Sequence, residues 1–66
     1  MNTSVLTQKQ RSVLDLLVQG MSNEEIAREL ELSHKTVKAH ITKMFRTLEC
    51  DSRARIIARY YTEPHT

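Results

Sequence analysis

Apolar residues recur at helical spacing in the middle of the chain. They are Val37, Ile41, Met44 and Leu48. The intervals are four, three and four residues, so at about 100° per residue they share a narrow sector of one helix face. This pattern predicts a helix over residues 34–48 with that side buried.

The opposite side of this helix carries positive charge. It consists of Lys35, Ala39, Thr42 and Arg46, with Lys38 and Lys43 on its two flanks, and is called the basic face below. No acidic residue occurs from His34 to Leu48. Surface helices normally mix their charges, so the basic face suggests a polyanionic partner, with a solvated lysine-rich face as the alternative.

Two capping signals precede the long helix. Thr7 and Gln10 fit a capping box that begins a helix over residues 8–19, and Gly20 ends it. Ser22 then begins a second capping box, which predicts a helix over residues 23–30.

A connection of three residues follows the second helix, and Ser33 is the predicted N-cap of the long one. Two helices joined in this way form a helix-turn-helix pattern. Glu31 stands where such turns often have glycine, and a left-handed conformation there would cost about 1 kcal/mol. A fourth helix is predicted over residues 52–61, capped by Asp51 or Ser52. Its apolar positions are Ala54, Ile57, Ala58 and Tyr61.

The chain is long enough for one small domain. A 66-residue chain buries only about 60% of its unfolded surface, so its stability should be modest. We predict an all-α fold, a four-helix bundle over residues 6–61 that contains the helix-turn-helix. Residues 1–5 are expected to be a disordered N-terminal end, and residues 62–66 a tail.

Composition argues against several classes of function. Cys50 is the single cysteine, expected as a small buried residue with a redox role as the alternative, so neither a disulfide nor a cysteine metal set is available. With no nucleophile elbow, metal-ligand cluster or glycine-rich phosphate loop, we expect no enzyme, cofactor, metal or small-molecule site. No apolar run reaches about 18 residues and no leader is recognisable, so we expect a cytoplasmic protein without membrane attachment.

The net charge of +2 is unevenly distributed. Residues 1–33 carry three basic and five acidic side chains, a net of −2, and residues 34–66 carry seven and three, a net of +4. The basic half is the one that begins with the long helix.

A helix of this kind fits the major groove of B-DNA, where base edges offer hydrogen bonds and thymine methyl groups. The candidate base-reading residues are Lys35, Lys38, Ala39, Thr42 and Lys43. The lysines can donate to guanine acceptors or to phosphates, and Ala39 is small enough to let the helix approach.

Candidate phosphate-binding residues lie mainly at helix starts, where amide groups and the helix dipole favour an anion. They are Asn23, Ser33, Thr36, His40 and Arg46. Each has a structural alternative. Asn23 and Ser33 suit caps without DNA, Thr36 can bond within its helix, His40 can pack beside the buried side, and Arg46 suits a helix C-terminus.

One further series of residues spans nearly the whole chain. It comprises Leu6-Thr7, Val13-Leu14, Leu16-Leu17, Gly20, Ser22-Asn23, Glu25-Ile26-Ala27, Leu30, Leu32-Ser33, Thr36-Val37-Lys38, His40, Leu48 and Arg53. In the order and spacing of this series, the chain resembles the LuxR-type (GerE-type) DNA-binding domain of bacterial transcription regulators. Departures are Lys9-Gln10 for the usual Arg-Glu, Thr47 for lysine and Glu49 for glycine.

The resemblance implies double-stranded DNA binding at an inverted repeat, with Lys38, Ala39 and Thr42 facing the bases. It also implies a weak homodimer through the outward side of the last helix, where Arg53, Ile56 and Tyr60 are candidates. Family members usually carry an N-terminal receiver or ligand-binding domain, so an excised output domain and a small stand-alone regulator both remain open. The alternative function is a protein-interaction module that docks an acidic partner or RNA polymerase.

Overall fold

The structure, a computed structural model, describes residues 1–64, and no strand occurs among them. The helices are α1 (Gln8–Val18), α2 (Asn23–Leu30), α3 (His34–Thr47) and α4 (Arg53–Thr62), preceded by a 3-10 turn, η1 (Thr3–Val5). The predicted all-α fold is confirmed, and every predicted helix boundary lies within one residue of the observed one.

Side-chain caps explain where the first two helices begin. The Gln10 amide donates to Thr7 Oγ1 at 3.1 Å and the Thr7 amide donates to Gln10 Oε1 at 3.0 Å, which completes the predicted capping box. Ser22 and Glu25 form the same reciprocal pair at the start of α2. Each pair satisfies two amide groups that the helix itself leaves without partners.

Left-handed residues end α2 and α3. Glu31, in the turn of the helix-turn-helix, has φ 54° and ψ 45°, and Glu49 after α3 also has φ 54°. The next amides close both helix ends, since Leu32 donates to the Ala27 carbonyl and Cys50 to the Phe45 carbonyl, each at 2.9 Å. Non-glycine residues in this conformation store about 1–2 kcal/mol each.

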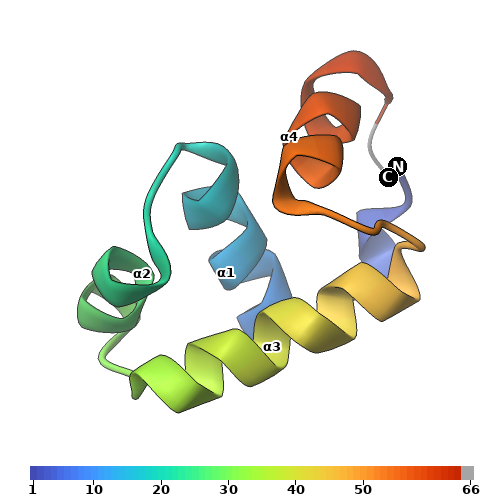
Figure 1. Ribbon diagram of the computed structural model, residues 1–66. Coiled ribbons are helices and arrows are strands. Elements are labelled where there is room, and N and C mark those ends of the chain that lie inside the picture. Colours follow the sequence, from blue (N-terminus) through green and yellow to red (C-terminus); the bar gives the residue numbers. More distant parts are fainter. Residues whose placement is uncertain (65–66) are drawn as a thin grey trace.

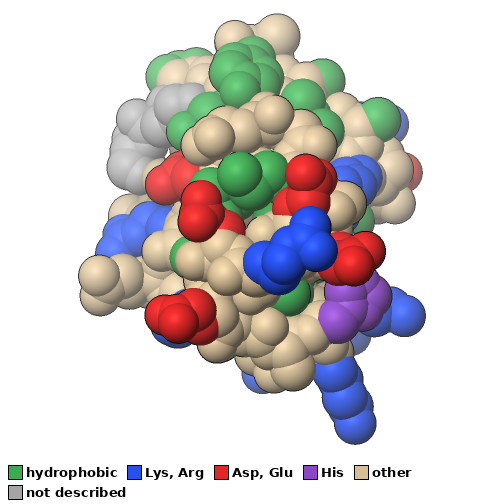
Figure 2. Space-filling model, turned by 90° about the vertical axis from the view of Figure 1, so that its left-hand side faces the viewer, with side chains coloured by type: hydrophobic (Ala, Val, Ile, Leu, Met, Phe, Trp, Pro, Cys, Tyr) green, Lys and Arg blue, Asp and Glu red, His purple; other side chains and the backbone are tan. Residues whose placement is uncertain are grey.

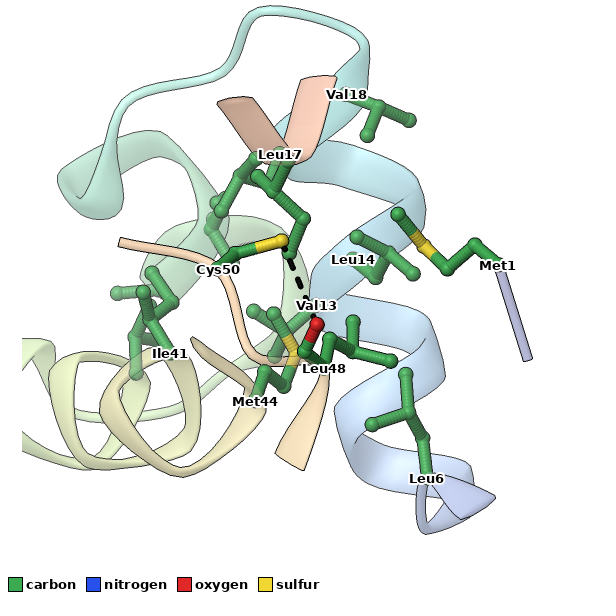
Figure 3. Packing of buried hydrophobic residues seen from close by; sticks show 14 residues of the cluster. Met1, Leu6, Val13, Leu14, Leu17, Val18, Ile41, Met44, Leu48 and Cys50 are labelled. Carbon is green, nitrogen blue, oxygen red and sulfur yellow. Dashed lines mark hydrogen bonds between the residues drawn. The ribbon is translucent and has the colours of Figure 1, made fainter. Parts of the chain in front are cut away.

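Helix α1 occupies the centre of the molecule. It packs against α2, α3 and α4, and α2 packs in addition against α3. Figure 1 shows α3 running beneath the other helices, with α2 near its start and α4 above its end. Figure 3 shows the buried cluster between α1, α3 and the α3–α4 connection, which includes Cys50 as expected, at 7% exposure.

The N-terminal end differs from the prediction of disorder. Residues Thr3–Val5 form a 3-10 turn that Asn2 caps, and the Met1 side chain is buried at 8% exposure. The apolar Met1 and Leu6 side chains join the core, which the absence of a periodic pattern did not indicate. At the other end, Thr62 belongs to α4. The predicted tail also included His65 and Thr66, which lie outside the described residues.

The predicted orientation of α4 is wrong. Ile56, expected on the outward side, is 0% exposed, and Tyr60 and Arg53 are half-buried. Of the apolar positions named for this helix, Ala54 and Ala58 are exposed, whereas Ile57 is half-buried against the core. Burying an isoleucine removes more apolar area from water than burying an alanine, so α4 turns Ile56 toward the core and leaves the two alanines outside.

Ser52, rather than Asp51, caps α4, because its Oγ accepts from the Arg55 amide at 3.1 Å. A second contact joins α4 to the end of α3. Arg59 Nη1 donates to the Leu48 carbonyl oxygen at 2.6 Å. The end of the long helix is therefore held from α4 as well as from its own left-handed turn.

Candidate nucleic-acid interface

The basic face of α3 lies entirely on the surface. All six of its side chains are exposed, from Lys35 near the start of the helix to Arg46 in its last turn. On the opposite side, Val37 and Met44 are 0% exposed. Burial of one side therefore fixes the rotation of α3 about its axis and directs the basic face outward.

The start of α3 presents two linked hydroxyl groups. Ser33 Oγ accepts from the Thr36 amide at 3.0 Å and donates to Thr36 Oγ1 at 2.8 Å. Since the Ser33 hydrogen is used in this pair, the Thr36 hydroxyl retains a hydrogen for an outside acceptor. The structural alternative for Ser33, that of a cap, is therefore realised, and Thr36 has the donor that a phosphate contact requires.

Asn23 opens α2 and is half-buried. Its Oδ1 accepts from Arg53 Nη1 at 2.6 Å, and Arg53 Nη2 donates to the Met21 carbonyl at the same distance. Arg53, a candidate for the dimer surface, is thus engaged with the start of α2 across 30 residues of sequence. No local pattern signals this contact, because the two residues belong to different helices.

A carboxylate also lies in the first turn of α2. The Ser22 amide donates to Glu25 Oε1 at 2.9 Å, and this bond is the main reason that the pKa of Glu25 lies below its ordinary value. The ionised carboxylate suits the positive end of the helix dipole. It also brings negative charge close to Asn23.

Acidic and basic side chains are unevenly distributed over the surface. Figure 2, which views the α2 side, shows acidic side chains gathered around the middle and a lysine or arginine side chain extending from the lower edge, where α3 runs in Figure 1. Exposed carboxylates on or just after α2 belong to Glu24, Glu25, Glu29 and Glu31. By contrast, α3 carries Lys35, Lys38, Lys43 and Arg46 and no carboxylate.

The remaining predicted contacts are distributed along α3. His40 is half-buried, which is compatible with both its packing alternative and a phosphate contact. Arg46 is exposed in the last turn, where it also complements the negative end of the helix dipole.

Two features are absent from residues 1–64. No helix there is both long and apolar enough to cross a membrane, and no three His, Cys, Asp or Glu side chains are grouped so that they could hold a metal ion.

The two helices α2 and α3, the left-handed turn between them and the outward basic face define a helix-turn-helix DNA-binding domain. Comparison with known proteins agrees. A family profile described as "Bacterial regulatory proteins, luxR family" matches residues 4–60. The chain therefore belongs to the luxR family of bacterial regulatory proteins, a DNA-binding regulatory family and not a family of enzymes.

Individual relatives are regulators by name. The chain is 48% identical over 50 residues to the nitrate/nitrite response regulator protein NarP of Escherichia coli, and the aligned residues make up 76% of the chain and 23% of that protein. It is 42% identical over 55 residues to the HTH-type transcriptional regulator MalT of Vibrio campbellii, and the aligned residues make up 83% of the chain and 6% of that protein. The chain thus spans a quarter or less of the length of these relatives.

Proposed function

We propose that the chain binds double-stranded DNA sequence-specifically, as the output domain or the stand-alone form of a bacterial transcription regulator in the cytoplasm. The observation that carries this proposal is the basic face of α3, which is exposed at all six positions, positively charged and free of carboxylates along the whole helix. An α-helix fits the major groove, and a face of this composition complements both base edges and phosphates.

The residues divide by position. Ala39 and Thr42 lie within the basic face and Lys38 lies on one of its flanks; these three are assigned to the bases, together with Lys35 and Lys43. The phosphate contacts are assigned to Asn23, to the linked pair Ser33 and Thr36, in which Thr36 supplies the side-chain donor, to His40 and to Arg46. Contacts of the second kind fix the register of the protein on the duplex and carry no sequence information directly.

Fluorescence anisotropy with a labelled duplex tests the proposal. We expect affinity to fall steeply with salt, with a slope of about −0.9 in log–log form for each phosphate neutralised. Unlabelled duplex should displace the labelled one. Absence of duplex binding at low salt, together with retention of an acidic protein partner or RNA polymerase, would favour the protein-interaction alternative instead.

We infer further that two copies occupy an inverted repeat through α4. The buried Ile56 is no part of this surface, which must use the exposed side of α4, where Ala54 and Ala58 lie one turn apart. Small side chains at this spacing let two helices approach closely. Ala58→Glu should weaken binding to a duplex with two half-sites while sparing a single half-site. The exposed Gln8→Glu is the control of equal charge change and should affect neither.

A further inference from the structure

Arg53 links the start of α4 to the start of α2. It is the first residue of α4, and its guanidinium donates to Asn23 Oδ1 and to the Met21 carbonyl oxygen, each at 2.6 Å. The main packing partner of α4 is α1, whereas α2 packs against α1 and α3. The arginine therefore makes a specific polar contact between two helices whose principal neighbours differ.

This contact determines how the Asn23 amide is oriented. A side-chain amide has an oxygen end that accepts and a nitrogen end that donates. Since Arg53 occupies the oxygen, the Nδ2 group is the end that remains for a partner outside the fold. A phosphate oxygen needs a donor, so the observed orientation is the productive one for a phosphate contact.

Charge gives a second reason for an arginine here. Glu24 and Glu25 lie in the first turn of α2 and would repel a phosphate that approached Asn23. Arg53 brings a guanidinium to the same turn. Because it is half-buried, its interaction with neighbouring charges is screened less than that of an exposed arginine.

We propose that Arg53 is a positioning residue for DNA binding, which holds the Asn23 amide oxygen so that the amide NH₂ group faces the DNA backbone. This inference rests on the proposed function, in which Asn23 contacts a phosphate. Arg53 acts through Asn23. It supports the start of α2 and is not part of the dimer surface.

A double-mutant cycle tests the dependence on Asn23. Arg53→Met should lower duplex affinity about tenfold in the natural chain and less than about twofold in the Asn23→Ala background, since the residues act as a unit. Equal losses in both backgrounds would overturn the proposal, because a direct phosphate contact or a general loss of stability predicts that result. Arg55→Met is the matched control on α4. Arg55 is exposed and pairs with Asp51, so its loss should be small and equal in both backgrounds.

Asn23→Asp separates the two ends of the amide. The aspartate keeps an oxygen for Arg53 and suits the first turn of a helix, so thermal unfolding should occur at or above the temperature of the natural chain. Duplex binding should fall below that of Asn23→Ala, because an oxygen replaces the donor. Binding equal to that of the natural chain would contradict the inference.

NMR of the free protein distinguishes failure of this inference from failure of the proposed function. The Asn23 side-chain NH₂ signals should shift in Arg53→Met and stay in place in Arg55→Met, with no DNA present. Unchanged signals in Arg53→Met would overturn the positioning role alone. Shifted signals in a protein that binds no duplex would overturn the proposed function, and with it any role of Arg53 in DNA binding.

Discussion

The Thr42 hydroxyl donates a hydrogen bond to the Lys38 carbonyl oxygen at 3.0 Å, one turn earlier in α3. A hydroxyl has a single hydrogen, so Thr42 presents an acceptor and a methyl group from the basic face. A base edge opposite Thr42 should therefore offer a methyl or an amino group, and not the acceptors of guanine. Because the Ala39 methyl group lies beside Thr42, we expect the base edge opposite Thr42 to present a thymine methyl group.

Substitutions of Thr42 separate these two contacts. Thr42→Val keeps the methyl and the shape, so affinity for the preferred duplex should change less than about twofold. Thr42→Ser removes the methyl and should lower discrimination at one base pair about five- to tenfold, which corresponds to about 1–1.4 kcal/mol. Competition between duplexes that differ at that base pair measures both. Lost preference in Thr42→Val with an unaffected Thr42→Ser would show that the oxygen is read instead.

Residues assigned to the bases and residues assigned to phosphates should respond differently to truncation to alanine. Lys38→Ala should remove preference among sequences, whereas Asn23→Ala should weaken all duplexes alike, because phosphate contacts are independent of sequence. Affinities for a preferred and a scrambled duplex measure both effects. A proportional reduction on both duplexes by both variants would contradict the assigned roles.

The left-handed glutamates predict two stabilising substitutions. Glu31→Gly and Glu49→Gly should each raise the free energy of unfolding by about 0.5–1 kcal/mol, since glycine relieves the backbone strain but loses more entropy on folding. Glu29→Gly is the control within α2, where glycine should destabilise by about 1 kcal/mol. Chemical denaturation measures all three. Destabilisation by both left-handed substitutions would show that these glutamate side chains outweigh the strain.

Substitution of Ile56 should lower the stability of the folded domain itself, and not only the contact between two copies. Ile56→Ala should lower the free energy of unfolding by about 2–5 kcal/mol, and Ile56→Glu by more, because it buries a carboxylate. Thermal unfolding of the free domain measures this. An Ile56→Glu variant that unfolds like the natural chain would place the side chain at the surface after all.

Ionisation of Glu25 should make the stability of the fold depend on pH in the acidic range. Its pKa is lowered in the folded state, chiefly by the bond from the Ser22 amide, so its contribution is present above the unfolded pKa and is lost as pH falls through the folded pKa. Thermal unfolding between about pH 3 and about pH 7 should therefore depend less on pH in Glu25→Gln. Glu29→Gln, which removes an exposed carboxylate outside the capping box, is the control. Equal pH dependence in Glu25→Gln and the natural chain would contradict this role.

Local signals were sufficient for the helices and for the rotation of α3. Capping boxes at Thr7 and Ser22 depend on residues three apart, and the buried side of α3 follows from one regular stripe. The orientation of α4 was not predictable in this way. Residues 54–61 are apolar at most positions, so more than one stripe fits, and packing on α1 decides which is buried.

The contact between Arg53 and Asn23 lay beyond sequence reasoning for a similar reason. Asn23 could be recognised as the start of a helix and Arg53 as part of a family pattern, but their approach requires the relative placement of α2 and α4. Tertiary packing sets this placement, and no spacing rule within a helix describes it.

Selection of binding sites from a random duplex library, at a low and a high salt concentration, tests the central claim most directly. We predict recovery of a common half-site, arranged as an inverted repeat, with more duplex retained at the lower salt. Retention of no duplex at either salt concentration would contradict DNA binding by the basic face of α3.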